Sequence, residues 1–114
     1  MSFLSAIFKS KSVNSDKIEI LDTKTYKEAV LGKNVQLVDV RTQREFRSGH
    51  IGKAVNIDFF KGGAFDRGFE NFDRKKPVYL YCRSGNRSQK AARKLVALGF
   101  DKVYDLKGGI LQWE

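Results

Sequence analysis

Two short apolar runs, at residues 35–40 and 78–81, constrain the fold of this chain more than any other feature of its sequence. Both consist mainly of valine, leucine and tyrosine on nearly consecutive positions. A run of this kind is typical of a strand that is buried on both faces, as in a parallel sheet covered by helices. Shorter apolar segments predict three further strands, at residues 18–21, 54–57 and 103–106.

Residues that typically cap helices occur between the predicted strands, and they predict helices there. Thr23 or Thr25 is expected to cap a helix that runs through Leu31 and ends at the following glycine. Thr42 is followed three residues later by Glu45, and this capping box predicts a short helix that ends near residue 49.

The second half of the chain continues this alternation. The clearest helix is expected over residues 88–98, where apolar residues recur at helical spacing. The glycine-containing segment 58–76 is expected to be a loop with one short helical turn near 69–72, and residues 109–113 should form a closing helical turn. Strands that alternate with helices over short connections predict an α/β fold with a mostly parallel central sheet and helices on both faces.

A chain of 114 residues has room for one domain of ordinary size. We assign this domain to residues 16–114 and interpret residues 1–15 as an N-terminal tail. The apolar residues within Met1–Phe8 are too few to span a membrane, and no basic residue precedes them as in a secretory signal. We therefore expect no association with a membrane.

The charge of the chain favours an anionic partner. Lysine and arginine total 22 against 13 aspartate and glutamate residues, which gives a formal net charge of +9. A small oxyanion, an acidic protein and nucleic acid would all be attracted. The basic residues near 74–76 and 90–94 lack interleaved aromatic residues, because the aromatics mostly follow strand or core patterns. We therefore expect a solvated basic rim and no binding of nucleic acid.

The chain contains one cysteine and one histidine. A single cysteine cannot form an intramolecular disulfide, and one cysteine with one histidine cannot build a cysteine and histidine metal cluster. A free thiol is also typical of a reducing compartment, so we expect a cytoplasmic protein without a bound metal.

The segment that carries chemistry joins the second buried run to the clearest helix, and it reads Cys82, Arg83, Ser84, Gly85, Asn86, Arg87 and Ser88. A ligand of a parallel sheet lies beyond the carboxyl ends of the strands, which is where Cys82 is expected. If the loop curls around the thiol, its backbone N–H groups and the following helix N-terminus form an anion-binding nest. Such a setting favours the thiolate and makes Cys82 a nucleophile without a histidine base. The alternative is an inert, buried cysteine.

Three motifs together resemble the rhodanese family and cover the chain from about residue 18 to its end. The first comprises Asp39-Val40-Arg41, Glu45-Phe46, Gly49-His50-Ile51, Ala54 and Asn56-Ile57. The second is the segment Cys82–Ser88, and the third is Leu106-Lys107-Gly108-Gly109-Ile110 with Trp113. The resemblance implies a rhodanese-like fold and a sulfurtransferase that carries sulfur as a persulfide on Cys82. It also implies thiosulfate or another small anionic donor, a thiol, cyanide or protein acceptor, and no cofactor.

The length of the loop separates the activities that relatives of this family carry. Six residues run from Cys82 to Arg87, whereas related phosphatase domains use a loop one residue longer to fit a phosphate. The shorter loop is similar to the sulfurtransferase form, so we expect neither phosphatase nor arsenate reductase activity. A non-catalytic binding module is the other alternative, but inactive relatives usually lack the cysteine. A slow sulfur relay stays open, and we expect a monomer.

Other residues receive supporting roles. Residues 83–88 are expected to bind the donor, with Arg83 and Arg87 attracting its charge. Asp39 and Arg41 are expected to form an ion pair that supports the loop. His50 is interpreted as a turn residue that satisfies backbone groups, not as a general base. Three phenylalanines in the long loop either line the mouth of the site or anchor the loop, namely Phe59, Phe60 and Phe65.

Overall fold

The computed structural model describes residues 16–113, and its centre is a five-stranded sheet in which every pair of neighbouring strands is parallel. The strand order is β1-β5-β4-β2-β3. The strands are β1 (Ile18–Leu21), β2 (Gln36–Asp39), β3 (Val55–Asn56), β4 (Val78–Tyr81) and β5 (Val103–Leu106). The α/β fold with a parallel sheet is therefore as predicted, and the two apolar runs that predicted it form the neighbouring strands β2 and β4.

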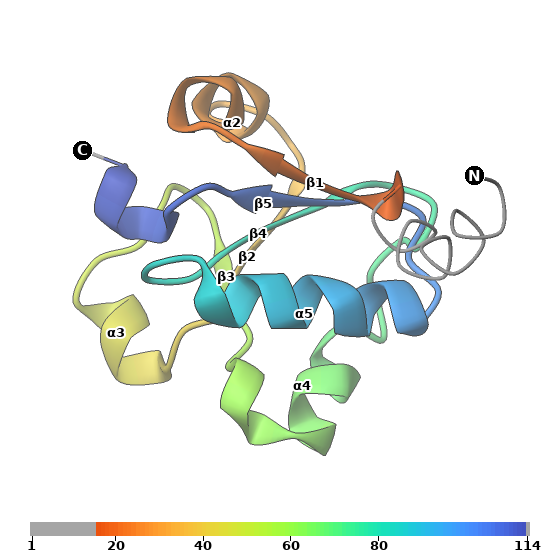
Figure 1. Ribbon diagram of the computed structural model, residues 1–114. Coiled ribbons are helices and arrows are strands. Elements are labelled where there is room, and N and C mark those ends of the chain that lie inside the picture. The colour runs from red at the N-terminus through yellow and green to blue at the C-terminus, as the bar shows by residue number, and fades with distance from the viewer. Residues whose placement is uncertain (1–15, 114) are drawn as a thin grey trace, which may run out of the picture.

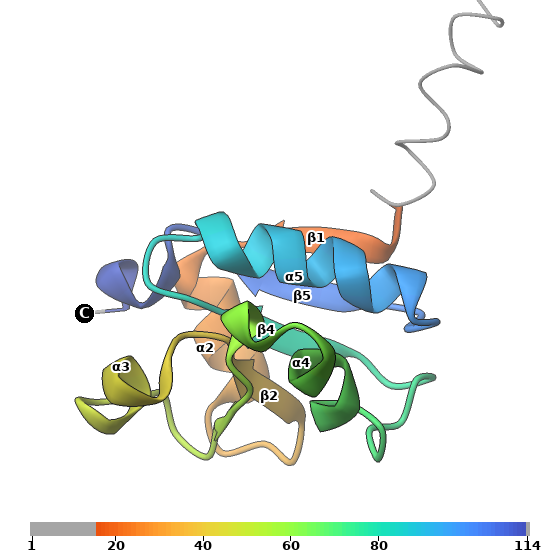
Figure 2. The ribbon, with the colours of Figure 1, turned by 90° about the horizontal axis from the view of Figure 1, so that it is seen from below.

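Helices cover both faces of this sheet (Figure 1). The helix α2 (Thr23–Val30) lies on one face, and α4 (Gly63–Gly68) and α5 (Asn86–Ala97) lie on the other. Seen from below, α5 and α4 cross in front of the strands (Figure 2). The short helix α3 (Gln43–Arg47) follows β2, and two single turns, η1 (Phe59–Lys61) and η2 (Gly109–Gln112), complete the elements.

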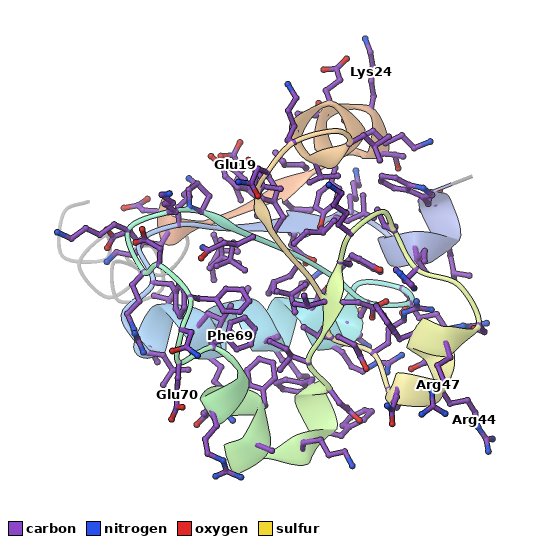
Figure 3. The ribbon with its side chains drawn as sticks, turned by 180° about the vertical axis from the view of Figure 1, so that it is seen from behind. Glu19, Lys24, Arg44, Arg47, Phe69 and Glu70 are labelled. Carbon is purple, nitrogen blue, oxygen red and sulfur yellow. The ribbon has the colours of Figure 1, made fainter. Side chains whose placement is uncertain are left out.

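Each buried strand contributes to a separate core on each face, because successive side chains of a strand point to opposite sides. In β4, Val78 and Leu80 pack beneath α5, whereas Tyr81 packs beneath α2. The α5 side also holds an aromatic cluster in which Phe65 and Phe69 have ring centroids 5.0 Å apart. Figure 3 shows Phe69 pointing into the interior, while Lys24, Arg44 and Arg47 project away from the chain. Burial on both faces explains why β4 and the segment 35–40 around β2 are rich in apolar residues on nearly consecutive positions.

Two helix starts differ from the prediction. Asp22, not Thr23 or Thr25, caps α2, and its carboxylate accepts a hydrogen bond of 2.8 Å from the backbone N–H of Thr25. The helix α5 begins at Asn86, two residues before the predicted start. Gly85 precedes it with a φ of +106°, a conformation that only glycine adopts readily, so the loop turns within fewer residues than expected.

The segment 58–76 contains more helix than predicted. Its helical turns occupy η1 and α4, and the expected position near 69–72 forms only a hydrogen-bonded turn from Phe72 N–H to the Phe69 carbonyl oxygen. Glycines at both ends of α4 suggested a loop, but Phe65 is fully buried and its packing stabilises the helix. Tertiary burial thus outweighs local propensity here.

The predicted tail, residues 1–15, and the last residue lie outside the described part of the chain. Within residues 16–113, every helix is too short or too polar to cross a membrane.

Candidate active site

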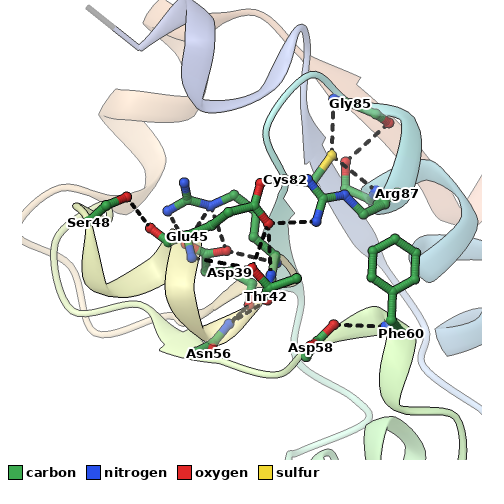
Figure 4. Close-up of polar contacts among 12 residues, drawn as sticks. Asp39, Thr42, Glu45, Ser48, Asn56, Asp58, Phe60, Cys82, Gly85 and Arg87 are labelled. Carbon is green, nitrogen blue, oxygen red and sulfur yellow. Dashed lines mark hydrogen bonds and ion pairs between the residues drawn. The ribbon is translucent and has the colours of Figure 1, made fainter.

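Cys82 lies directly after β4, at the carboxyl edge of the sheet, and leads into a tight loop before α5 (Figure 4). The neighbouring strands bring other segments to the same edge, because parallel strands share their direction. The helix α3 arrives from β2 and the turn η2 from β5. The three motifs noted in the sequence therefore meet around one sulfur atom.

The loop directs backbone donors at this sulfur. The N–H groups of Gly85 and Ser88 lie 3.0 and 3.3 Å from Cys82 Sγ. The Ser88 hydroxyl donates to the Gly85 carbonyl oxygen at 3.3 Å and holds the two donors in register. Only 1% of Cys82 is exposed, yet its sulfur accepts two hydrogen bonds from the backbone.

The turn η2 holds the first residues of the loop from the side. The N–H of Ile110 donates to the Cys82 carbonyl oxygen at 2.9 Å, and that of Leu111 donates to the Arg83 carbonyl oxygen at 3.2 Å. Gly109 lies so close that a Cβ atom built on it would collide with the backbone of Arg83 and stand 2.7 Å from the Cys82 carbonyl oxygen. Gly109 of the closing motif is thus required for this close backbone approach.

Asp39 and Arg41 form a buried ion pair next to the loop. The Asp39 carboxylate accepts hydrogen bonds from the Arg41 backbone N–H, Nε and Nη2, the last at 2.7 Å. Arg41 Nη2 also donates to the Gly49 carbonyl oxygen at 2.6 Å. Burial lowers the pKa of Arg41, but its hydrogen bond to Asp39 and the charge of that carboxylate outweigh burial and raise it. The amide of Asn56 donates to the carbonyl oxygens of both residues, at 3.0 and 2.8 Å, which fixes the turn between β2 and α3.

Arg87 is held by a second ion pair that the sequence analysis missed. Its Nη1 and Nη2 donate to Glu45 Oε1 and Oε2 at 2.8 and 2.9 Å, so α3 is joined to the loop by a bidentate contact. This hydrogen bond is the main cause that lowers the pKa of Glu45 to about 2, against the opposing effect of burial. The guanidinium carbon also lies 5.4 Å from the ring centroid of Phe60, which is 66% exposed at the mouth of the loop.

The remaining predicted residues occupy the rim. Arg83, Ser84 and Asn86 are exposed, so they are placed to meet a molecule that arrives from solvent. His50 is exposed in the turn after α3, with Nδ1 3.2 Å from the Phe46 carbonyl oxygen and its ring stacked on Phe46. Among residues 16–113, no three histidine, cysteine, aspartate or glutamate side chains gather in a way that could hold a metal ion.

Glu45 had a signal that could have identified its second role. It was interpreted as part of the first motif and of the capping box with Thr42, and the structure contains this capping box. The box uses Oε1 for the Thr42 N–H and hydroxyl, at 2.9 and 3.0 Å, and leaves room for Arg87. The partner of the Glu45 carboxylate becomes apparent only in the fold, which brings α3 next to Arg87.

Comparisons with known proteins agree with this geometry. The family model of the rhodanese-like domain matches residues 13–114. The chain is 36% identical over 87 residues to the thiosulfate sulfurtransferase GlpE of Coxiella burnetii, covering 76% of this chain and 78% of that protein. It is 39% identical over 95 residues to the uncharacterized protein YqhL of Bacillus subtilis, covering 82% and 73%.

A solved structure of a rhodanese-like domain protein from Staphylococcus aureus superimposes with a TM-score of 0.73 at 30% identity, covering 84% of this chain and 91% of that one. The family model extends across the strand, loop and helix that surround Cys82. The chain therefore belongs to the rhodanese-like domain family.

Proposed function

We propose that this protein is a sulfurtransferase that moves the outer sulfur of a small anionic donor, such as thiosulfate, to an acceptor through a persulfide on Cys82. The observation that carries the proposal is the convergence of the Gly85 and Ser88 N–H groups on Cys82 Sγ, at 3.0 and 3.3 Å. Two donors aimed at Sγ stabilise the negative charge of the Cys82 thiolate, which attacks the donor in the first step and departs again in the second. The thiosulfate sulfurtransferase among the relatives supports the choice of donor.

The proposed reaction has two displacement steps. The Cys82 thiolate attacks the outer sulfur of thiosulfate, a new S–S bond forms to Sγ, and the S–S bond of thiosulfate breaks. The electron pair of that bond leaves with sulfite. In the second step the acceptor, a thiolate or cyanide, attacks the outer sulfur of the persulfide, and the Cys82 thiolate departs. Charge and atoms balance in both steps, so no redox cofactor is needed.

The first turn of α5 supplies further stabilisation. The first N–H groups of a helix have no partner within the helix, and the positive end of the helix dipole lies at the same point. Because α5 begins at Asn86, these groups belong to the loop itself. The outer sulfur of the persulfide would lie where they can donate to it.

The two arginines of the loop have different proposed roles. Arg87 is engaged with Glu45 and orders the loop, whereas Arg83 is exposed and free to attract the sulfonate of the donor. The exposed fraction of Cys82 is only 1%, so a donor must present its sulfur at the end of a narrow group. Thiosulfate and a cysteine persulfide of a donor protein both have this shape. We propose a monomer that works in a reducing, cytoplasmic setting, where the cysteine remains a free thiol.

Mass spectrometry of the intact protein tests the proposal. Incubation of the reduced protein with thiosulfate should add the mass of one sulfur atom, and cyanide or a reducing thiol should remove it. Cys82→Ser should form no adduct and should lose thiosulfate to cyanide transfer, while its unfolding curve stays close to that of the wild type.

Two controls make the result interpretable. Protein alkylated at its single cysteine should show no adduct, which rules out sulfur that is merely adsorbed. Aryl phosphates should be hydrolysed slowly or not at all. Efficient hydrolysis without a sulfur adduct would establish a phosphatase instead. A folded, reduced sample that shows neither activity would point to a binding module.

A further inference from the structure

Asp105 is a buried carboxylic acid without a partner. It lies in the third position of β5, its exposed fraction is 0%, and neither carboxyl oxygen has a hydrogen-bond partner among the described residues. Its neighbours in the sheet register are Ile20 on β1 and Leu80 on β4, which are apolar. An ionised carboxylate at such a position is costly, and natural proteins rarely keep one without a reason.

The side chain faces α5, the helix that starts at the Cys82 loop. Asp105 is two residues from Val103, which packs beneath α5, so both side chains point to the same face of the sheet. Burial raises the pKa of Asp105 to about 7. The Ser88 hydroxyl and the Leu106 backbone N–H are close enough to oppose this in part, although neither makes a hydrogen bond of standard geometry with the carboxyl group. Around neutral pH the group therefore exists both as a neutral acid and as a carboxylate.

One other titratable group is coupled to Asp105, and it does not ionise in the same range. Burial, and then the charge of Asp105, raise the pKa of Tyr26 on α2 well above its ordinary value. The residues that α5 buries against the sheet are Ser88, Ala91, Ala92 and Leu95, which carry no charge. The nearest arginine in the first turn of α5, Arg87, is paired with Glu45. Among the described carboxyl groups, Asp105 is thus the one whose pKa burial raises to about 7.

Ser88 connects Asp105 to the sulfur. Its hydroxyl has one hydrogen to donate, and it donates it to the Gly85 carbonyl oxygen at 3.3 Å. The Gly85 and Ser88 N–H groups are the two donors to Cys82 Sγ. An ionised Asp105 would compete for the same hydroxyl hydrogen, because a carboxylate is a stronger acceptor than a carbonyl oxygen.

We propose that Asp105 is a positioning residue for Cys82 that acts through Ser88. When Asp105 is neutral, the Ser88 hydroxyl keeps its hydrogen bond to the Gly85 carbonyl oxygen. When Asp105 is ionised, it draws the hydroxyl away and weakens the hold of the Gly85 and Ser88 N–H groups on Cys82 Sγ. The proton of Asp105 exchanges with solvent, and no other group is consumed. This inference rests on the proposed role of Cys82 as the nucleophile. It predicts that the reaction rate of the Cys82 thiol changes with pH as Asp105, a carboxyl group 23 positions along the chain, ionises.

Asp105→Asn is the sharpest variant, because asparagine keeps the size and stays neutral at every pH. The ratio of the alkylation rate of Cys82 in Asp105→Asn to that in the wild type should rise from about one near pH 5.5 to roughly three near pH 8.5, where a threefold change equals about half a pKa unit. Asp101→Asn, an exposed aspartate in the turn before β5, is the matched control and should give a ratio of one throughout. Ser88→Ala should flatten the rise that Asp105→Asn produces when both changes are combined.

A second measurement follows Asp105 directly. Carbon-13 NMR of protein labelled at aspartate carboxyl carbons, assigned by the signal missing in Asp105→Asn, should show one carboxyl that titrates near neutral pH. A signal that titrates in the ordinary range of aspartate would overturn the inference. So would a near-neutral titration accompanied by an alkylation ratio that stays at one.

Neither measurement uses sulfur transfer. A protein that transfers no sulfur but shows both titrations would refute the proposed function and preserve the coupling of Asp105 to the thiol. Normal sulfur transfer with an alkylation ratio that stays at one would support the proposed function and refute the coupling of Asp105 to the thiol.

Discussion

Replacing Glu45 with glutamine removes one charge from the contact that joins α3 to the Cys82 loop and leaves the shape of the side chain unchanged. In the wild type, both carboxylate oxygens accept hydrogen bonds from Arg87, at 2.8 and 2.9 Å. The Arg87 and Glu45 side chains are 20% and 27% exposed, so the pair is shielded from water without being buried. Glutamine can accept from only one side of the guanidinium fork.

The size of the effect follows from the pKa of Glu45. A decrease from 4.5 to about 2 corresponds to about 3 kcal/mol, at roughly 1.4 kcal/mol for each tenfold change in the ionisation constant. Solvent screening of a partly exposed pair reduces this to about 1–2 kcal/mol. Because the folded-state pKa is lowered, this stabilisation is fully present above pH 4.5, the ordinary pKa of glutamate, and is lost as the pH falls toward 2.

Urea unfolding monitored by the fluorescence of Trp113, which packs edge-on against Tyr26, measures this difference. The free energy of unfolding of Glu45→Gln should lie about 1–2 kcal/mol below that of the wild type at neutral pH, and the gap should close in acid. Glu70→Gln, at an exposed glutamate after α4, should have no effect. A gap that is absent at neutral pH, or that persists unchanged into strong acid, would refute the reasoning.

Two further substitutions test the contacts that hold the loop in place. Gly109→Ala should destabilise the fold by about 2 kcal/mol or more and slow sulfur transfer, because its Cβ would collide with the Arg83 backbone and its φ is +69°. Thermal unfolding measures the loss of stability and the transfer assay measures the loss of activity. Wild-type values in both would contradict the close approach of Gly109 to the loop. Asp39→Ala should cost about 3–5 kcal/mol, since it leaves the Arg41 guanidinium buried without a counter-charge. Urea unfolding that shows a loss below about 1 kcal/mol would indicate that water replaces the carboxylate.

The positions of the strands and of Cys82 could be predicted because they depend on residues that are close in the chain. A strand repeats every two residues, and burial on both faces makes β4 continuously apolar and places apolar residues at most positions of the segment 35–40, which contains β2. The position of a cysteine at the carboxyl end of such a strand then follows from the alternation of strands with helices. The capping box of Thr42 and Glu45 spans four residues and was predicted for the same reason.

The helices of the long loop could not be predicted, because their stability comes from distant contacts. Glycines 62, 63 and 68 are typical of a loop when the sequence is considered alone. In the fold, the Phe65 ring lies 5.5 Å from that of Phe59 and contacts the core beneath α5, and burial of that ring stabilises the helix. The question left open by the sequence is settled for Phe65, which is an anchor, and for Phe60, which lies at the mouth of the site.

The sequence by itself therefore determined which residues we propose for the chemistry: one cysteine at a strand end, followed by a short loop with donors and arginines. The tertiary structure decided which groups those residues meet. Glu45 and Arg87 are 42 positions apart, and Ile110 holds a carbonyl 28 positions away. Asp105 is an ordinary member of an apolar strand in the sequence, and only the packing of β5 beneath α5 deprives it of water. The reason is physical: local patterns set the conformation of the backbone, whereas partners and burial depend on which strands become neighbours in the sheet.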